Sequence, residues 1–227
     1  MIVAERKPFD AILQMLGSSR RVMVLGCRTC VAVCLAGGDR EVAVLASELR
    51  LKAAADGREL QLVEKSVERQ CDREFVEPLA AELAKVDVVL SLGCGCGVQF
   101  LAEVFPNLVV LPGLNTRLIG VTTDQGEWAE RCGTCGDCML DITGGICPIA
   151  RCSKSLLNGP CGGSQDGRCE VNSQTDCAWQ LIYDRLERLG RLDQLAQPLP
   201  PRDWRTARDG GPRRVTRPEA KIEKSKE

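Results

Sequence analysis

Residues 86–92 read Val86-Asp87-Val88-Val89-Leu90-Ser91-Leu92, and they form the clearest strand candidate in the chain. A short, nearly continuous apolar run is typical of a strand that is buried on both faces of a sheet. A second such run precedes it at Arg21–Gly26, and weaker strand candidates lie at Glu59–Val63 and Leu108–Leu111. This pattern predicts an α/β fold with a parallel, doubly wound sheet, flavodoxin-like in outline. The helices that alternate with these strands are expected at Phe9–Leu16, Glu41–Ala55, Phe75–Lys85 and Val98–Phe105.

A run of cysteines follows this α/β half. The chain has 14 cysteines and no histidine in 227 residues. Eight of the cysteines stand among Gly, Pro, Asp and Asn residues, in a segment with too little apolar periodicity to build a core of its own. Thiolate ligands select zinc, copper(I) or iron–sulfur clusters. The segment therefore predicts two four-cysteine metal sites, with the ligands Cys132, Cys135, Cys138, Cys147, Cys152, Cys161, Cys169 and Cys177.

The spacing at the start of this run favours iron–sulfur clusters over zinc. Cys132, Cys135 and Cys138 are each separated by two residues, as in bacterial ferredoxins, where a tight loop directs successive sulfurs at one cubane. Cys147 follows only after eight further residues, so the spacing does not assign it to a cluster. Structural zinc bound by four cysteines is the alternative, because the absence of histidine excludes mixed Cys/His zinc sites and Rieske clusters.

The N-terminus and the hydropathy of the chain bear on its compartment. A disulfide framework would need an oxidising compartment. Residues Met1–Pro8 contain charged side chains and no long apolar run, so they do not resemble a secretory signal. No stretch approaches the roughly 18 apolar residues that a membrane span requires. We therefore expect a soluble cytoplasmic protein with reduced cysteines.

The other six cysteines lie in the α/β half, mostly where a predicted strand ends. Two follow the Arg21–Gly26 strand, two follow the strand of residues 86–92, and one lies in the connection after the second strand. Parallel strands bring their carboxyl ends to one edge, where open α/β sheets assemble their sites. The alternative is that these cysteines are small buried apolar residues, and Cys34, one helical turn after Cys30, fits either role. A third metal site is expected with the ligands Cys27, Cys30, Cys71 and Cys94.

The loop Gly93-Cys94-Gly95-Cys96-Gly97 follows a strand and opens a helix, as a dinucleotide-binding loop does. That fingerprint requires G-x-G-x-x-G and an acidic residue about 20 positions further on. Here the third glycine comes too early, and two cysteine side chains would crowd a pyrophosphate. We interpret the loop as one that bears a cluster, with nucleotide binding as the alternative.

Composition and charge divide the chain into three parts. The aromatic content is only 4%, so the core must consist mainly of Val, Leu, Ile and Ala, and the net charge of −1 gives no signature of nucleic-acid binding. From Pro201 onward there are nine Lys and Arg against five Asp and Glu, with few apolar residues. We expect an α/β domain at 1–125, a cysteine-rich iron–sulfur domain at 126–200 and a disordered charged tail at 201–227.

Three segments of the cysteine-rich part resemble a known family. They are Asn158-Gly159-Pro160-Cys161-Gly162-Gly163, then Gly167-Arg168-Cys169-Glu170-Val171, then Cys177-Ala178-Trp179 with Ile182-Tyr183-Asp184-Arg185-Leu186. They resemble the cysteine-rich domain that accompanies methylenetetrahydrofolate reductase in bacteria. With the α/β half included, the chain is similar to the small iron–sulfur subunit of the two-subunit reductases of acetogens.

The resemblance implies a partner and a role. It implies that flavin and folate bind to a catalytic partner subunit, while this chain carries two [4Fe–4S] clusters, and a third if the α/β half also binds one. The expected function is electron transfer from an unidentified donor to the flavin of methylenetetrahydrofolate reductase. Without histidine, the chain is poorly equipped for acid–base catalysis of its own. Two alternatives stay open: a structural zinc scaffold of the same complex, and a stand-alone nucleotide-dependent reductase.

One helix of the cysteine-rich part is predicted with an apolar face. It spans Cys177–Leu189, and its apolar residues recur at spacings of three and four. This face is expected to pack against the cysteine-rich domain or to dock a partner. Its members are Trp179, Ile182, Tyr183, Leu186 and Leu189.

Overall fold

A computed structural model describes residues 1–220 of the chain. The chain divides into two compact units, and the first comprises Met1–Glu130. The second begins at Arg131. The division lies five residues beyond the boundary expected from the sequence.

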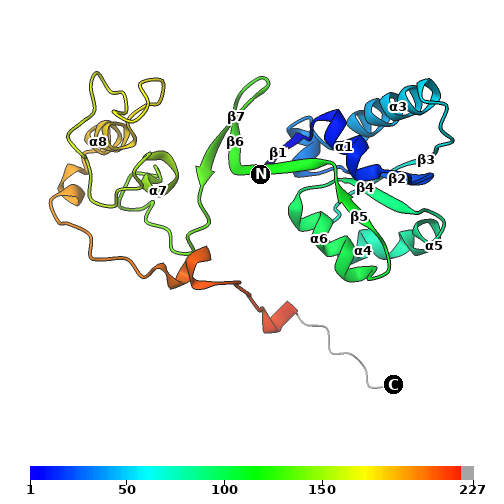
Figure 1. The fold of residues 1–227 in the computed structure, drawn as a ribbon. Helices are drawn as coiled ribbons and strands as arrows, with labels where there is room; N and C mark the ends of the chain where they lie inside the picture. Colours follow the sequence, from blue (N-terminus) through cyan, green and yellow to red (C-terminus); the bar gives the residue numbers. More distant parts are fainter. Residues whose placement is uncertain (221–227) are drawn as a thin grey trace. The chain divides into compact units, whose positions relative to one another are not determined.

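A four-stranded parallel sheet forms the centre of the first unit (Figure 1). Its strands are β2 (Arg21–Cys27), β3 (Gln61–Val67), β4 (Val88–Leu92) and β5 (Val110–Pro112), in the order β3-β2-β4-β5. All three neighbouring pairs are parallel. After β2 the chain forms β3 on one side of it and then β4 on its other side. The direction in which strands are added therefore reverses between β2 and β4. The predicted α/β fold is confirmed.

Helices cover both faces of this sheet, as Figure 1 shows. Alternate residues of β2 point to opposite faces: Val22 and Val24 belong to one apolar core, and Met23 and Leu25 to the other. The first core also contains residues of α1 (Phe9–Leu16) and α3 (Asp39–Ala55). The second core contains residues of α4 (Arg73–Val76), η1 (Glu77–Leu79), α5 (Ala80–Leu83) and α6 (Gly95–Val104).

Two helices differ from the sequence expectation. The single helix predicted over Phe75–Lys85 is divided into α4, η1 and α5, because Pro78 lies in its middle and cannot donate a helical hydrogen bond. α6 begins at Gly95, three residues before the predicted start. A further short helix, α2 (Cys30–Val33), follows β2.

An antiparallel sheet in the first unit was not predicted. It has the order β1-β6-β7 and consists of β1 (Ile2–Arg6), β6 (Leu114–Asp124) and β7 (Glu127–Cys132). Ile2 pairs with Ile119 and Arg6 with Leu114. These strands expose much of their length and carry many polar residues, so they lack the continuous apolar run by which β2 and β4 are recognised.

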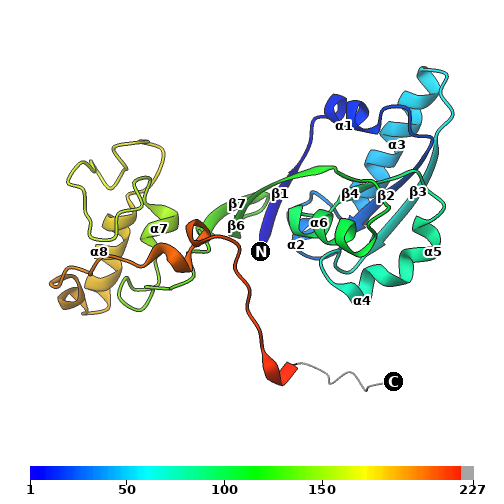
Figure 2. The ribbon, with the colours of Figure 1, turned by 60° about the horizontal axis from the view of Figure 1, so that its bottom comes forward.

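The second unit has little regular structure (Figure 2). Its helices are α7 (Pro148–Arg151) and α8 (Ala178–Arg188), and its 3-10 turns are η2 (Leu192–Leu195), η3 (Trp204–Thr206), η4 (Arg208–Gly210) and η5 (Pro218–Ala220). Trp179, Ile182 and Leu186 of α8 are buried in a small apolar core. Tyr183 and Leu189 are 45% and 44% exposed, so the apolar face is narrower than predicted.

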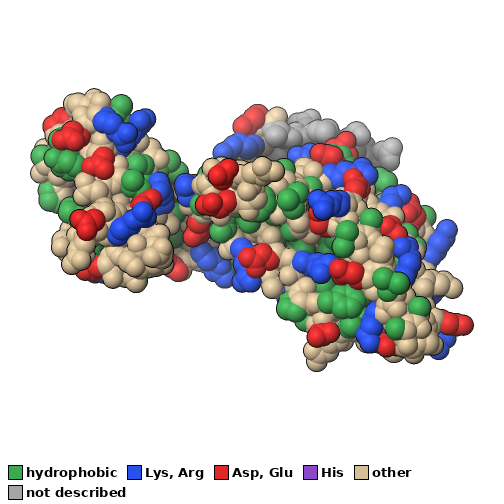
Figure 3. Space-filling model, turned by 90° about the horizontal axis from the view of Figure 1, so that it is seen from above, with side chains coloured by type: hydrophobic (Ala, Val, Ile, Leu, Met, Phe, Trp, Pro, Cys, Tyr) green, Lys and Arg blue, Asp and Glu red, His purple; other side chains and the backbone are tan. Residues whose placement is uncertain are grey.

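The charged tail predicted at 201–227 lies partly within the described residues. Residues 201–213 contain two 3-10 turns and contact the first cysteine loop of the same unit. Part of the predicted tail, residues 221–227, lies outside the described residues. On the face of each unit that Figure 3 shows, acidic and basic side chains are interspersed. Within residues 1–220, no helix is long and apolar enough to cross a membrane.

Candidate metal centres

Four cysteines of the second unit line one small cavity. Cys152, Cys161, Cys169 and Cys177 surround a space of about 20 Å³, together with Trp179. Cys152 directly follows α7, and Cys177 directly precedes α8. The sequence could not divide the eight predicted ligands into groups. The cavity brings together the last four of them.

The surroundings of this cavity favour a thiolate at Cys169. The Ser153 hydroxyl lies 3.4 Å from Cys169 Sγ. The hydrogen bond between this hydroxyl and the sulfur, and then the hydrogen bonds with the backbone of Val171 and Asn172, hold the pKa of the Cys169 thiol below its usual range. A lowered pKa favours the deprotonated form, which is the form that binds metal.

Backbone contacts fix two of the four cysteines relative to each other. The Cys177 N–H donates to the Gly167 carbonyl at 2.8 Å, and the Cys169 N–H donates to the Thr175 carbonyl at 2.9 Å. These bonds connect the loop that carries Cys169 to the start of α8. The sequence predicted Cys177 inside the first helical turn, whereas it lies one position earlier, as the N-cap.

The first cysteine loop is tight and contains hydrogen bonds to sulfur. The Thr134 N–H donates to Cys132 Sγ at 3.4 Å. Arg202 Nη2 donates to Cys135 Sγ at 3.2 Å. Thr134 and Gly136 adopt φ angles of 52° and 86°, which allow the chain to turn between successive cysteines. Hydrogen bonds from N–H groups to thiolate sulfur are one way in which proteins tune iron–sulfur clusters.

The thiols of the chain are all free. Within residues 1–220, no group of three or more Cys, Asp and Glu side chains is close enough together to hold a metal ion. A metal bound in the small cavity would therefore have to draw the four thiols inward. The donor set itself fits a thiolate-bound metal, because four cysteines line one cavity and the pKa of Cys169 is lowered.

In the first unit, three thiols at or beyond the carboxyl ends of parallel strands interact electrostatically: Cys27, Cys71 and Cys94. Burial raises the pKa of the Cys71 thiol, and the neighbouring Cys94 and Cys27 thiols raise it further. Burial also raises the pKa of Cys96, with further contributions from Cys94, including a hydrogen bond. Cys96, which the sequence did not predict as a ligand, therefore belongs to this group of thiols.

Cys30 and Cys34 form a different pair. Cys34 is buried, and its Sγ lies 3.5 Å from the Ala4 nitrogen and 3.5 Å from the Val31 carbonyl oxygen. Burial raises the pKa of Cys34, and the Cys30 thiol adds to this effect. Of the two roles that the sequence left open for Cys34, the structure supports packing. The Cys30 thiol lies close enough to Cys34 to affect its pKa.

Two buried polar residues hold the strand ends together, and the sequence analysis missed both. Gln70 Nε2 donates to the Leu25 carbonyl of β2 at 2.8 Å. The Ser91 hydroxyl of β4 donates to Gln70 Oε1 at 2.5 Å, and it accepts from the Gly93 N–H at 3.0 Å. Because Gln70 immediately precedes Cys71, this network sets the positions of the loops that carry Cys71 and Cys94. The one available signal in the sequence was Ser91, a polar residue within the apolar run of residues 86–92 that needs a hydrogen-bond partner when it is buried.

The glycines of the 93–97 loop allow close packing against Gln70. A Cβ atom on Gly93 would lie 2.5 Å from Gln70 Oε1, and one on Gly97 would lie 2.8 Å from Gln70 Cβ. Real Cβ atoms essentially never approach other atoms so closely. This gives a packing reason for two of the three glycines that resemble a dinucleotide-binding loop.

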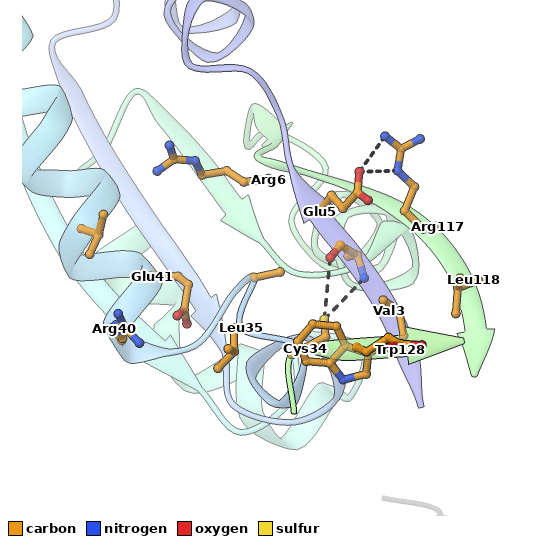
Figure 4. Close-up of a pocket in the computed structure, with 15 residues that line it drawn as sticks. Val3, Glu5, Arg6, Cys34, Leu35, Arg40, Glu41, Arg117, Leu118 and Trp128 are labelled. Carbon is orange, nitrogen blue, oxygen red and sulfur yellow. Dashed lines mark hydrogen bonds and ion pairs between the residues drawn. The ribbon is translucent and has the colours of Figure 1, made fainter. Parts of the chain in front are cut away.

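A cavity of about 760 Å³ also lies in the first unit, between β1 and the start of α3 (Figure 4). Arg117 and Glu5 form an ion pair at its edge, at 2.7 Å. Among the described residues, Cys34 is the only cysteine in its lining. The Cys34 Sγ accepts from the Ala4 N–H at 3.5 Å and donates to the Ala4 carbonyl at 3.7 Å, and dashed lines mark two hydrogen bonds of this sulfur in Figure 4. The lining does not include the 93–97 loop. This cavity is therefore separate from the cysteine groups described above.

Comparison with known proteins gives one match. No curated protein and no solved structure matches the chain. A family model described as methylene-tetrahydrofolate reductase C terminal matches residues 111–205. The matched range includes β6, β7, both cysteine groups of the second unit and Arg202. Over residues 111–205, the chain is therefore similar to the C-terminal domain of methylene-tetrahydrofolate reductase.

Proposed function

We propose that the chain is an iron–sulfur electron-transfer subunit of a methylenetetrahydrofolate reductase complex. It would accept electrons from a donor and pass them singly to the flavin of a catalytic partner. The observation that carries this proposal is the cavity lined by Cys152, Cys161, Cys169 and Cys177, which lies within the range that resembles the reductase domain.

Two ligand sets follow from this grouping. The cavity cysteines would hold one [4Fe–4S] cluster. Cys132, Cys135 and Cys138 would hold the other, and Cys147 is the remaining cysteine available as its fourth ligand. A [4Fe–4S] cluster supplies one-electron chemistry when it is bound. The chain's own residues orient the thiolates: Ser153 at Cys169, the Thr134 N–H at Cys132 and Arg202 at Cys135.

The first unit would carry a further site at the ends of the parallel strands. Cys27, Cys71, Cys94 and Cys96 are the thiols that interact there. This set replaces Cys30 of the sequence expectation with Cys96. It rests on three loops that meet at one edge of the sheet and on the Gln70 network that fixes them.

The need for a partner follows from the chemistry of folate reduction. Reducing a carbon centre takes two electrons, so single-electron carriers require a flavin as converter. The chain has no histidine for acid–base catalysis, and the glycines that resemble a dinucleotide loop pack against Gln70. These observations favour the relay over a stand-alone reductase. Metal identity decides between the relay and the zinc scaffold.

Metal analysis of anaerobically purified protein tests the proposal. We expect iron and acid-labile sulfide in equal amounts, at about eight per chain for two clusters or about twelve for three. Cys161→Ala should remove about four iron atoms, and Cys94→Ala about four more if the strand-end site is occupied. Cys34→Ala is the matched control and should keep its iron. Zinc without sulfide would establish the scaffold instead, and unchanged iron in Cys94→Ala would restrict the clusters to the second unit.

Turnover provides a second test of the same proposal. The loaded chain, mixed with a reduced electron donor and methylenetetrahydrofolate, should form no methyltetrahydrofolate until the flavoprotein subunit is added. Product formation by the chain alone, in the absence of flavin, would contradict the relay.

A further inference from the structure

We infer that Arg202 is a positioning residue for the cluster at the first cysteine loop, and that it raises the reduction potential of that cluster. The inference rests on the proposed function. Arg202 lies 67 residues beyond Cys135 in sequence, yet its Nη2 donates to Cys135 Sγ at 3.2 Å. The same nitrogen also donates to the Asp137 carbonyl. The guanidinium thus holds both the sulfur and the backbone of the loop between Cys135 and Cys138.

The burial of Arg202 indicates a negative charge beside it. Its side chain is only 8% exposed, and its Nε is buried without a hydrogen-bond partner among the described residues. A buried guanidinium is costly unless an anion lies nearby. The Asp137 carboxylate lies 3.9 Å away, but that side chain is 71% exposed and therefore well screened. Thiolates that bind a cluster at Cys132, Cys135 and Cys138 would supply a less exposed negative charge beside Arg202 than the Asp137 carboxylate does.

Arg202 belongs to a segment that covers the loop, residues 202–213, which we call the C-terminal strap. The Thr206 hydroxyl donates to the Cys135 carbonyl at 2.9 Å. Arg213 donates to the carbonyls of Thr134 and Thr206. Gly136 permits this approach, because a Cβ atom there would lie 2.2 Å from the Thr206 carbonyl oxygen. Side chains of the strap therefore hydrogen-bond to backbone carbonyls of the loop, and Arg202 places a positive charge beside Cys135.

The electrostatic consequence has a definite sign. Reduction adds one negative charge to a cluster, and a buried cation stabilises the reduced state more than the oxidised state. Hydrogen bonds to cysteine sulfur and the local charge both set cluster potentials. Removing the Arg202 charge should therefore lower the potential of one cluster, while the cluster of the Cys152 group keeps its own.

The experiment compares three variants with the wild-type chain. Arg202→Gln removes the charge and keeps a polar side chain, and Arg202→Lys keeps the charge without the planar donor fork. Arg205→Gln is the matched control, because Arg205 is in the strap but is 89% exposed and pairs with Asp203. Iron and sulfide content are measured first, followed by redox titration monitored by electron paramagnetic resonance.

The expected result is a lower potential for one cluster in Arg202→Gln, partial recovery in Arg202→Lys and no change in Arg205→Gln. Loss of one cluster in Arg202→Gln that Arg202→Lys restores would support the same role. Potentials and iron content equal to those of Arg205→Gln would overturn the inference and leave the proposed function intact. Cluster loss in both Arg202 variants would also overturn it, because Arg202→Lys keeps the positive charge and would then still fail to retain the cluster. Wild-type protein without iron would refute the proposed function itself.

Discussion

Gln70 is 1% exposed, and its amide group makes both of its hydrogen bonds to the neighbouring strands β2 and β4. A buried polar group of this kind is costly when one partner is removed, because the other is left without a hydrogen bond. Here the network spans the point at which the strand order reverses, and three cysteine-bearing loops leave the sheet around it.

Gln70→Ala should destabilise the first unit. The substitution leaves the Leu25 carbonyl without its Gln70 donor and the Ser91 hydroxyl without its acceptor, and it opens space under Gly93 and Gly97. We expect a loss of about 2–4 kcal/mol in the free energy of unfolding. Urea denaturation measures it, with Gln99→Ala as the control, because Gln99 is exposed on α6 and should change stability by less than about 0.5 kcal/mol. Equal effects of the two substitutions would show that the network contributes nothing.

At the scale of single residues, the sequence located most of the chemistry but not its supports. Cysteine is rare enough that its spacing alone marked eight candidate ligands in the second unit, although it did not divide them into groups. Gln70, Ser153 and Arg202 act through contacts formed only when distant segments meet, and no local pattern marks them. The inclusion of Cys96 in the proposed strand-end site has the same origin, since the sequence does not show that its thiol interacts with those of Cys94 and Cys71.

Among the elements, β2 and β4 were the most predictable, and one carboxylate joins their amino ends. Asp87 Oδ2 accepts from the backbone N–H groups of Arg20 and Arg21, at 3.1 and 2.9 Å. Its Oδ1 accepts from Arg21 Nε and Nη2, at 2.9 and 2.6 Å. The bonds from the Arg21 backbone, and then from the Arg21 side chain, hold the pKa of Asp87 below its ordinary value of 3.8.

This lowered pKa predicts a pH dependence with a definite sign. A carboxyl group whose pKa is lower in the folded state stabilises the fold above its ordinary pKa, and that contribution is lost as the pH falls through the lowered value. Asp87→Asn should therefore be less stable than the wild type at pH 7, and the difference should shrink below about pH 4. Urea midpoints from far-ultraviolet circular dichroism between pH 7 and pH 3 measure this. A difference that stays constant over the whole range would rule out the ionised carboxylate as its source.

The elements that escaped prediction have weak local signals. β1, β6 and β7 are polar and partly exposed, and β1 finds its partner more than a hundred residues away. The Phe75–Lys85 segment has helical periodicity throughout, yet Pro78 divides it. Periodicity therefore identified the buried elements, while the pairing of exposed strands depended on contacts that lie far apart in sequence.

For the whole molecule, the two units differ in what stabilises them. The first has two apolar cores, one on each face of its sheet. The second has one small core, formed by Cys177, Trp179, Ile182 and Leu186 with a few partly buried neighbours. If the second unit binds metal as proposed, so small a core would draw much of its folding free energy from the metal.

Metal removal should therefore separate the units by their resistance to protease. After chelation or oxidation of the clusters, trypsin should cleave rapidly at Arg151, Lys154 and Arg168, while a fragment that contains the first unit persists. Mass spectrometry of the fragments over time measures this, with the loaded protein as the control. If the second unit stays resistant without metal, the two four-cysteine sites are not what holds it together.

The position of the C-terminal strap in the chain has a consequence for biosynthesis. All of the candidate ligands, up to Cys177, precede Arg202 in sequence, so a ribosome makes them first. Throughout that interval the loop between Cys132 and Cys138 lacks its cover and is open to whatever machinery delivers iron and sulfide. If the loop binds a cluster as proposed, the order of translation leaves it accessible for metal to enter before the strap can cover it.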